Sequence, residues 1–137
     1  MRVLFICTHN ISRSRVAEDT FRVLAWSVPS RERHEARSAG ITPQPGGRAI
    51  ARADVEWADV ICVMEAAHEA VIRARWPLHG SKIRVLDIPD VYQPDDPALR
   101  DLMVRQVRAL LGEAASRERP AISRIDPSKR STPGQRG

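Results

Sequence analysis

The chain alternates short apolar runs with longer segments in which apolar residues recur at helical spacing. Buried strands are predicted at residues 2–6 and 60–64, a further strand at 83–88, and a more polar edge strand at 34–38. Helices are predicted over residues 14–26, 47–53 (a short one), 66–76 and 97–111. Because strands and helices alternate, we expect an α/β fold with a four-stranded parallel sheet and helices on both faces.

Turn and capping residues divide the pattern. Pro29 breaks the first helix, Asp96-Pro97 has the N-cap-plus-proline form that begins a helix, and Gly112 predicts the end of that helix. Beyond Arg117 the chain is rich in Pro, Ser, Arg and Gly without apolar periodicity. We therefore expect one domain over residues 1–116 and a basic, disordered tail over residues 117–137.

One loop near the start of the chain carries the candidate chemistry. Cys7 and Arg13, with five residues between them, follow the first predicted strand and precede the first predicted helix. Backbone N–H groups of such a loop can converge on a phosphate-like oxyanion, which the positive end of the helix also attracts. The planar guanidinium of Arg13 can hold two oxygens of that anion. The expected anion-binding residues are Thr8, His9, Asn10, Ile11, Ser12, Arg13 and Ser14.

The same electrostatic field would stabilise a thiolate and make Cys7 a nucleophile, with Ser14 donating a hydrogen bond to it. The alternative is that Cys7 is only a small buried residue at the end of a core strand. The presence of Arg13 and Ser14 in a strand-loop-helix setting favours the nucleophile. The glycine-rich loop GxxxxGK[ST] is absent, so nucleoside triphosphate chemistry is not expected.

At these residues the chain resembles the low-molecular-weight protein tyrosine phosphatases, whose Cys-x5-Arg-Ser loop directly follows the first strand. Three further stretches match in order: Ser38–Gly40, Trp57–His68 and Asp87–Tyr92. The resemblance covers about residues 1–112. It implies a small flavodoxin-like domain that hydrolyses phosphotyrosine or small aryl phosphate monoesters through a phosphocysteine, without a metal or other cofactor.

Departure of the alcohol requires a general acid opposite the nucleophile. Asp90 follows the fourth predicted strand, and the resemblance places the family's acid there. Asp96 is an alternative, although a role as helix N-cap explains it better, and a chain without any acid is a further alternative. Tyr92 is either an aromatic wall for a substrate ring, as the resemblance implies, or an exposed loop residue. Asn10 is expected to brace the loop, because asparagine tolerates left-handed backbone.

Several positions depart from the family's pattern. Ser12 stands where many members carry a second cysteine, and His9 stands where glycine is usual. His9 could line the substrate entrance or be a solvated loop residue. Arg15 and Val91 replace prolines, and the stretch between Gly40 and Trp57 is short. Because that stretch normally builds part of the cleft wall, we expect a shallow pocket.

Composition and charge limit the binding partners and the cellular location that we expect. Of the net charge of +5, a net of +4 falls in residues 117–137, so the folded part is nearly neutral and is not expected to bind nucleic acid. No apolar run is long enough for a membrane span, and we expect no signal peptide. Cys7 and Cys62 do not form a disulfide framework, which suits a cytoplasmic protein. The expected partner is a phosphorylated protein or a small phosphate ester.

Two other functions compete. An arsenate reductase would share the fold and the loop, but it needs resolving thiols, and only Cys62, expected in the core, remains. A catalytically decayed oxyanion-binding or regulatory module is the other.

His68 is expected at a solvated helix position rather than as a metal ligand, since no cluster has zinc-ligand spacing. The tryptophans at element ends are expected to pack: Trp26, Trp57 and Trp76.

Overall fold

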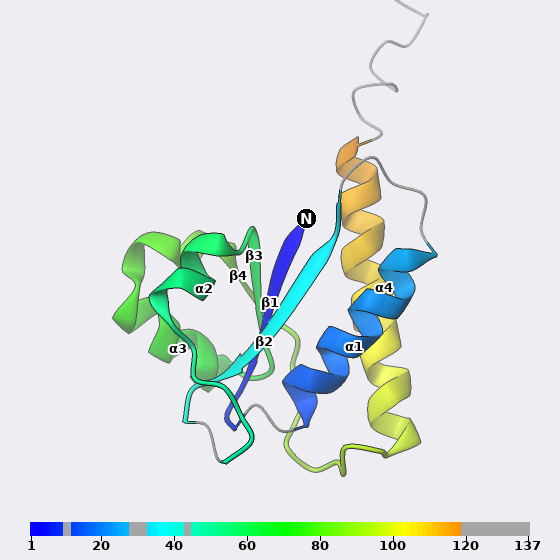
Figure 1. Ribbon diagram of the computed structural model, residues 1–137, viewed down its shortest axis with the longest axis horizontal. Helices are drawn as coiled ribbons and strands as arrows, with labels where there is room; N and C mark the ends of the chain where they lie inside the picture. The colour runs from blue at the N-terminus through cyan, green and yellow to red at the C-terminus, as the bar shows by residue number, and fades with distance from the viewer. Residues whose placement is uncertain (10–11, 28–32, 43–44, 119–137) are drawn as a thin grey trace, which may run out of the picture.

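The computed structural model describes residues 1–9, 12–27, 33–42 and 45–118 (Figure 1). The strands are β1 (Arg2–Cys7), β2 (Glu35–Gly40), β3 (Val60–Val63) and β4 (Ile83–Val85). The helices are α1 (Arg13–Trp26), α2 (Arg52–Trp57), α3 (Ala66–Arg75), the 3₁₀ helix η1 (Pro77–Lys82) and α4 (Pro97–Glu118). All strand pairs are parallel and the order is β2-β1-β3-β4. This confirms the predicted four-stranded parallel sheet.

Helices cover both faces of the sheet, with α1 and α4 on one side and α2 and α3 on the other (Figure 1). Side chains of β1 alternate between the two layers, as the two-residue period of a strand requires. Val3, Phe5 and Cys7 belong to the core with α1 and α4, whereas Leu4 and Ile6 belong to the opposite core. The alternation therefore directs Cys7 toward the layer of α1 and α4.

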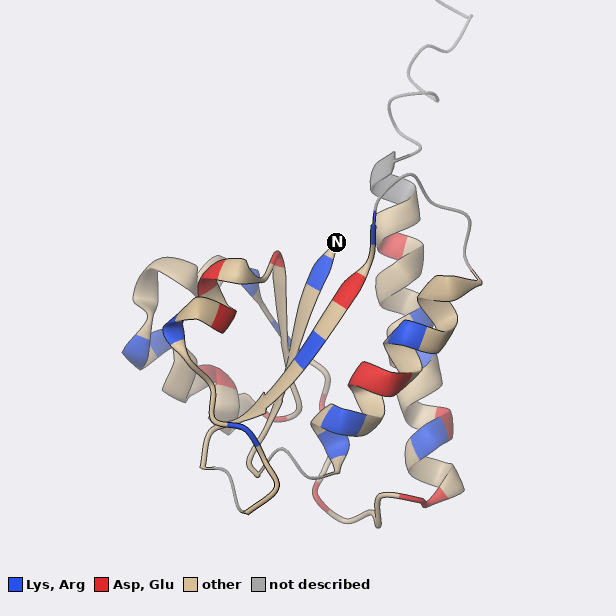
Figure 2. Cartoon of the chain, viewed as in Figure 1, with Lys and Arg blue, Asp and Glu red and all other residues tan. Residues whose placement is uncertain are grey.

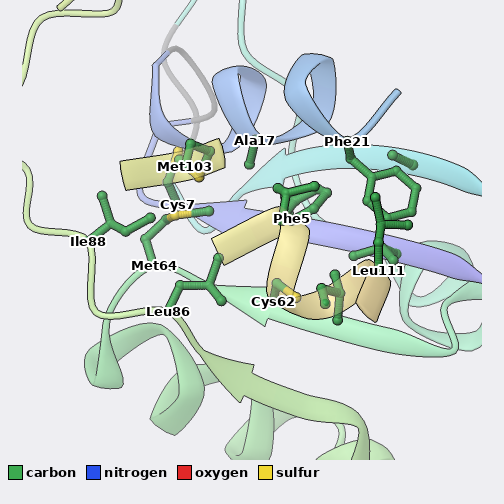
Figure 3. Packing of buried hydrophobic residues seen from close by; sticks show 14 of the residues in the cluster. Phe5, Cys7, Ala17, Phe21, Cys62, Met64, Leu86, Ile88, Met103 and Leu111 are labelled. Atoms are coloured by element: carbon green, nitrogen blue, oxygen red, sulfur yellow. The ribbon is translucent and has the colours of Figure 1, made fainter. Parts of the chain in front are cut away.

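The end of β1 is tightly packed. Figure 3 shows Cys7 beside Met64, Ile88 and Met103, all of which belong to the same buried cluster. In open parallel sheets, ligands bind beyond the carboxyl ends of the strands, at the point where the strand order reverses. Because β1 lies between β2 and β3, Cys7 reaches this edge of the sheet.

The fourth strand is shorter than predicted, ending at Val85 rather than at residue 88. The reason is Asp87, which takes a left-handed conformation (φ 57°) that aspartate tolerates better than most residues. The segment remains tied to β3, since the N–H of Ile88 donates to the Met64 carbonyl at 2.8 Å. The turn therefore fixes the position of Ile88 at the sheet edge.

Two helices differ from the prediction. The short helix lies at 52–57 rather than 47–53. Ala49 forms a parallel bridge with Gly40, so the chain is still extended there. The Asp54 carboxylate accepts the Ala51 N–H at 3.0 Å, just before the helix begins. Gly112 does not end α4, which continues to Glu118. A glycine costs a helix about 1 kcal/mol, and buried side chains on both sides of Gly112 offset that cost. The predicted tail thus begins inside α4, and residues 119–137 lie outside the described residues.

The surface is mixed in charge. Figure 2 shows basic and acidic residues interspersed over both helical layers, as expected for a near-neutral domain. Trp57 and Trp76 pack against the core beside α2 and α3 as predicted, but the prediction for Trp26 was wrong, since it is 93% exposed at the end of α1. None of the helices among the described residues is long and apolar enough to cross a membrane.

Candidate active site

The loop after β1 begins and ends in buried side chains. Cys7 is 3% exposed, and Arg13 and Ser14 open α1 with almost no exposed surface. The Ser14 Oγ lies 3.0 Å from the Cys7 Sγ, so the expected contact is present and the hydroxyl can donate to a thiolate. Asn10 and Ile11, which were predicted to brace the loop and bind the anion, lie outside the described residues.

A cavity of about 330 Å³ opens at this edge of the sheet. Its size is within the range of sites that bind small ligands. The lining residues are Cys7, His9, Ser12, Arg13, Asp90, Tyr92, Gln93 and Pro94. The structure therefore brings six residues predicted from the sequence into one pocket. Tyr92 both lines the pocket and packs against the core with α1 and α4, and half-buried His9 lines the pocket as well.

Asp90 sits at the rim of the pocket with its side chain 60% exposed. Its Oδ1 lies 3.9 Å from the Nε of Arg13. Asp96 has another task, because its Oδ1 accepts the Ala98 N–H at 2.8 Å and caps α4, as predicted. Of these two carboxylates, Asp90 is the one that lines the pocket with Cys7.

The short segment after β2 contributes directly to the site. The N–H of Thr42 donates to the Thr8 carbonyl at 2.8 Å, and the Thr42 carbonyl lies 2.9 Å from the Nδ1 of His9. Since a carbonyl only accepts, His9 must donate through Nδ1. Arg15 donates to the carbonyl of Gly46, which has a positive φ of 90°. Thus the short segment still reaches the loop that joins β1 to α1, called the phosphate loop below (residues 8–13), and holds one side of it.

Two further residues contact the loop, and the sequence analysis missed both. Glu65 pairs with Arg13, and the Nε2 of His68 lies 3.0 Å from the Thr8 Oγ1. The prediction that His68 is solvated was wrong, since it is 5% exposed. Burial and the nearby Arg13 guanidinium lower the pKa of His68, although Glu65 and Asp90 oppose this. Like Asp90, Glu65 lies just beyond the carboxyl end of a strand, two residues after the end of β3, and its position was therefore open to prediction from the sequence.

Cys62 lies in the core, as predicted. It is fully buried, and burial raises its pKa to about 12. Neither Cys7 nor Cys62 forms a disulfide. A thiol in this environment stays protonated and unreactive at neutral pH. Within the described part of the chain, no group of three or more His, Cys, Asp or Glu side chains is arranged to hold a metal ion.

Sequence comparison adds to this geometry. Residues 2–56 match the family model described as "Low molecular weight phosphotyrosine protein phosphatase". The resemblance to the low-molecular-weight phosphatases is thereby confirmed. The matched segment contains the whole loop from Cys7 to Ser14. The family is one of phosphoric monoester hydrolases, which confirms the predicted enzyme class. No curated protein sequence matches the chain.

Solved structures support the fold. The low-molecular-weight protein tyrosine phosphatase from T. tengcongensis is 21% identical, with 82% of this chain and 99% of that chain covered and a TM-score of 0.67. The tyrosine phosphatase Wzb from Escherichia coli K30, solved with phosphate, is 22% identical, with coverages of 82% and 96% and a TM-score of 0.66. The YwlE arginine phosphatase from Geobacillus stearothermophilus is 20% identical, with coverages of 84% and 96% and a TM-score of 0.64.

Proposed function

We propose that this low-molecular-weight phosphatase relative hydrolyses phosphotyrosine or small aryl phosphate monoesters through a phosphocysteine on Cys7. The observation that carries the proposal is the pocket in which Cys7, Arg13 and Asp90 meet. These are a nucleophile, a cation that binds phosphate oxygens, and a carboxylic acid. No other group in the pocket needs to be recruited for the reaction.

In the first step, the Cys7 thiolate attacks phosphorus while the bond from phosphorus to the ester oxygen breaks. Arg13 stabilises the charge on the phosphoryl oxygens, and protonated Asp90 gives its proton to the departing alcohol. In the second step, water attacks the phosphorus of the phosphocysteine while Asp90 takes a proton from that water. The sulfur–phosphorus bond breaks, its electrons return to Cys7 as the thiolate, and inorganic phosphate leaves. Ser14, 3.0 Å from the sulfur, stabilises the thiolate before the first step and after the second.

Two observations support the covalent route and the substrate class. A variant of the YwlE arginine phosphatase carries a phosphorylated active-site serine, so a residue of that pocket can accept a phosphoryl group. In this chain Tyr92 lines the pocket and is held by core packing. A fixed aromatic ring beside Asp90 suits an aryl leaving group, because aromatic rings pack favourably against one another.

The competing functions have less support. An arsenate reductase would need a second thiolate to resolve an adduct on Cys7, and Cys62 is fully buried with a raised pKa. A decayed binding module would not need an acid at the pocket rim, where Asp90 is found.

The proposal is tested by steady-state hydrolysis of p-nitrophenyl phosphate, phosphotyrosine peptide and phosphoarginine by the wild type and by Cys7→Ser. We expect turnover of the two aryl esters by the wild type and none by Cys7→Ser, with unchanged melting temperatures. Preference for phosphoarginine would overturn the substrate class. Phosphate binding without turnover of any substrate would identify a decayed module instead.

A further inference from the structure

The start of α3 contacts both ends of the phosphate loop. Glu65, the residue before α3, pairs with Arg13 at the end of the loop. One turn later, His68 contacts Thr8 at the beginning of the loop. We propose that Glu65 and His68 are positioning residues, which set the orientation of the Arg13 guanidinium and the place of Thr8 for the phosphate. This inference rests on the proposed function, which names phosphate as the group bound there.

Glu65 restricts how Arg13 can turn. The NH1 of Arg13 donates both to the Glu65 carboxylate and to the Ile88 carbonyl, the latter at 2.8 Å. A guanidinium is planar, so holding NH1 fixes the plane of the whole group. The Nε atom is on the side of Asp90, at 3.9 Å from its Oδ1. The edge formed by Nε and NH2 is thus left to grip two phosphate oxygens.

Glu65 also compensates charge. The Arg13 side chain is 3% exposed, and an uncompensated cation at such a depth is costly. The Glu65 side chain is 42% exposed, so it can balance Arg13 while remaining partly hydrated.

The hydrogen bonds of His68 identify its tautomer. The N–H of Glu65 lies 3.1 Å from Nδ1, and a backbone N–H can only donate, so Nδ1 accepts. Neutral His68 therefore carries its proton on Nε2 and donates it to the Thr8 Oγ1 at 3.0 Å. The Thr8 carbonyl is held separately by the N–H of Thr42. Side chain and backbone of Thr8 are thus fixed from two different segments.

An opposite role for Glu65 is conceivable on charge alone, because a carboxylate beside Arg13 could compete with phosphate. The geometry favours positioning, since Glu65 occupies NH1 together with the Ile88 carbonyl, whereas Asp90 and the pocket are on the Nε side. The two roles predict opposite signs for the change in phosphate affinity when Glu65 is removed.

The experiment measures binding of inorganic phosphate by calorimetry and hydrolysis of p-nitrophenyl phosphate in Glu65→Ala, Glu65→Gln and the wild type. Hydrogen bonds to charged groups imply a loss of phosphate affinity on the order of 10- to 100-fold for Glu65→Ala. Glu65→Gln keeps an acceptor for Arg13 and should retain most of the affinity. Glu69→Gln, which changes a partly exposed carboxylate paired with Arg73 on the same helix, is the matched control and should bind phosphate like the wild type.

A second pair of variants isolates the contact with Thr8. In His68→Gln the amide nitrogen can take the place of Nε2 and donate to Thr8, but the acceptor at Nδ1 is lost. In His68→Asn the amide oxygen can take the place of Nδ1, but the donor is lost. We expect His68→Gln to keep its phosphate affinity but to have a lower melting temperature. We expect His68→Asn to keep its melting temperature but to bind phosphate more weakly.

Tighter phosphate binding by Glu65→Ala would overturn the inference and make Glu65 a competitor. Unchanged binding in Glu65→Ala, or equal losses of affinity in the two His68 variants, would also overturn it. The failure of the proposed function would look different from the failure of this inference. If the proposed function is wrong, the wild type binds phosphate without hydrolysing any ester. The order of phosphate affinities among the variants would then still test the positioning role.

Discussion

Replacing Asp90 by asparagine removes the proposed general acid with little change of shape. The structure indicates that little else is lost, because the side chain is 60% exposed and, among the described residues, its ion-pair partner is Arg13, whose Nε is 3.9 Å away. At this separation, and with the Asp90 carboxylate largely in solvent, the ion pair is worth about 1 kcal/mol or less. Substrate binding should therefore change only severalfold, and the main loss should appear in the chemical step.

General acid catalysis contributes about 10²- to 10⁴-fold, equivalent to about 3–5 kcal/mol of barrier. We expect Asp90→Asn to approach that loss on phenyl phosphate, whose leaving group is strongly basic. The loss should be far smaller on p-nitrophenyl phosphate, whose leaving group needs less protonation. The assay compares kcat for both esters in the wild type, Asp90→Asn and Asp96→Asn.

Asp96→Asn is the matched control, because asparagine is as good an N-cap as aspartate and Asp96 caps α4. It should show no leaving-group dependence and at most a small loss of helix stability. Dependence in Asp96→Asn but not in Asp90→Asn would place the acid at Asp96. Dependence in neither variant would refute the acid role and, with it, this mechanism.

Three further predictions concern stability and reactivity. Folding lowers the pKa of His68, so its contribution to stability is complete above its ordinary pKa and is lost as the pH falls from there toward the folded-state pKa. Melting temperatures measured from pH 8 to pH 5 should therefore fall more in the wild type than in His68→Gln. Equal falls in the two proteins would contradict this. An alkylating reagent at neutral pH should modify Cys7 and spare Cys62, whose pKa is about 12; mass spectrometry of the peptides tests this, and rapid labelling of Cys62 would contradict its burial. Deletion of residues 119–137 should leave turnover and melting temperature nearly unchanged, because the sequence there has no core-forming pattern, whereas a large loss of stability would mean that this segment packs on the domain.

The parts of the fold that the sequence predicted best are those with a strong apolar pattern. The runs around Phe5 and Ile61 are buried on both faces, so every residue is apolar and the strand is evident. The candidate residues Cys7, Arg13 and Asp90 meet in one pocket for a related reason. Parallel strands deliver the residues after their carboxyl ends to one edge, which brings together loops distant in sequence.

The remaining features depend on contacts that local pattern does not encode. The start of α2 is decided by a bond from Ala51 to Asp54 and by the bridge between Ala49 and Gly40, the latter distant in sequence from α2. Gly112 is a stop signal by propensity, but tertiary burial overrides it.

The same limit applies to part of the candidate site. His68 looks like a polar residue on a helix surface. Only the fold shows that it is buried against Thr8, with Glu65 directed to Arg13. Their side chains act through hydrogen bonds across the sheet edge, and the spacing of residues along α3 contains no information about the partner on the other side.

The most direct test of the central claim is detection of the phosphocysteine itself. Wild-type protein quenched in acid during turnover of p-nitrophenyl phosphate should show one added phosphoryl group, located by peptide mass spectrometry on Cys7. Arg13→Ala should retain its fold but lose both turnover and the adduct, because its guanidinium stabilises the charge that develops on phosphorus-bound oxygens. Turnover by the wild type without any adduct, or undiminished turnover by Cys7→Ser, would contradict the account.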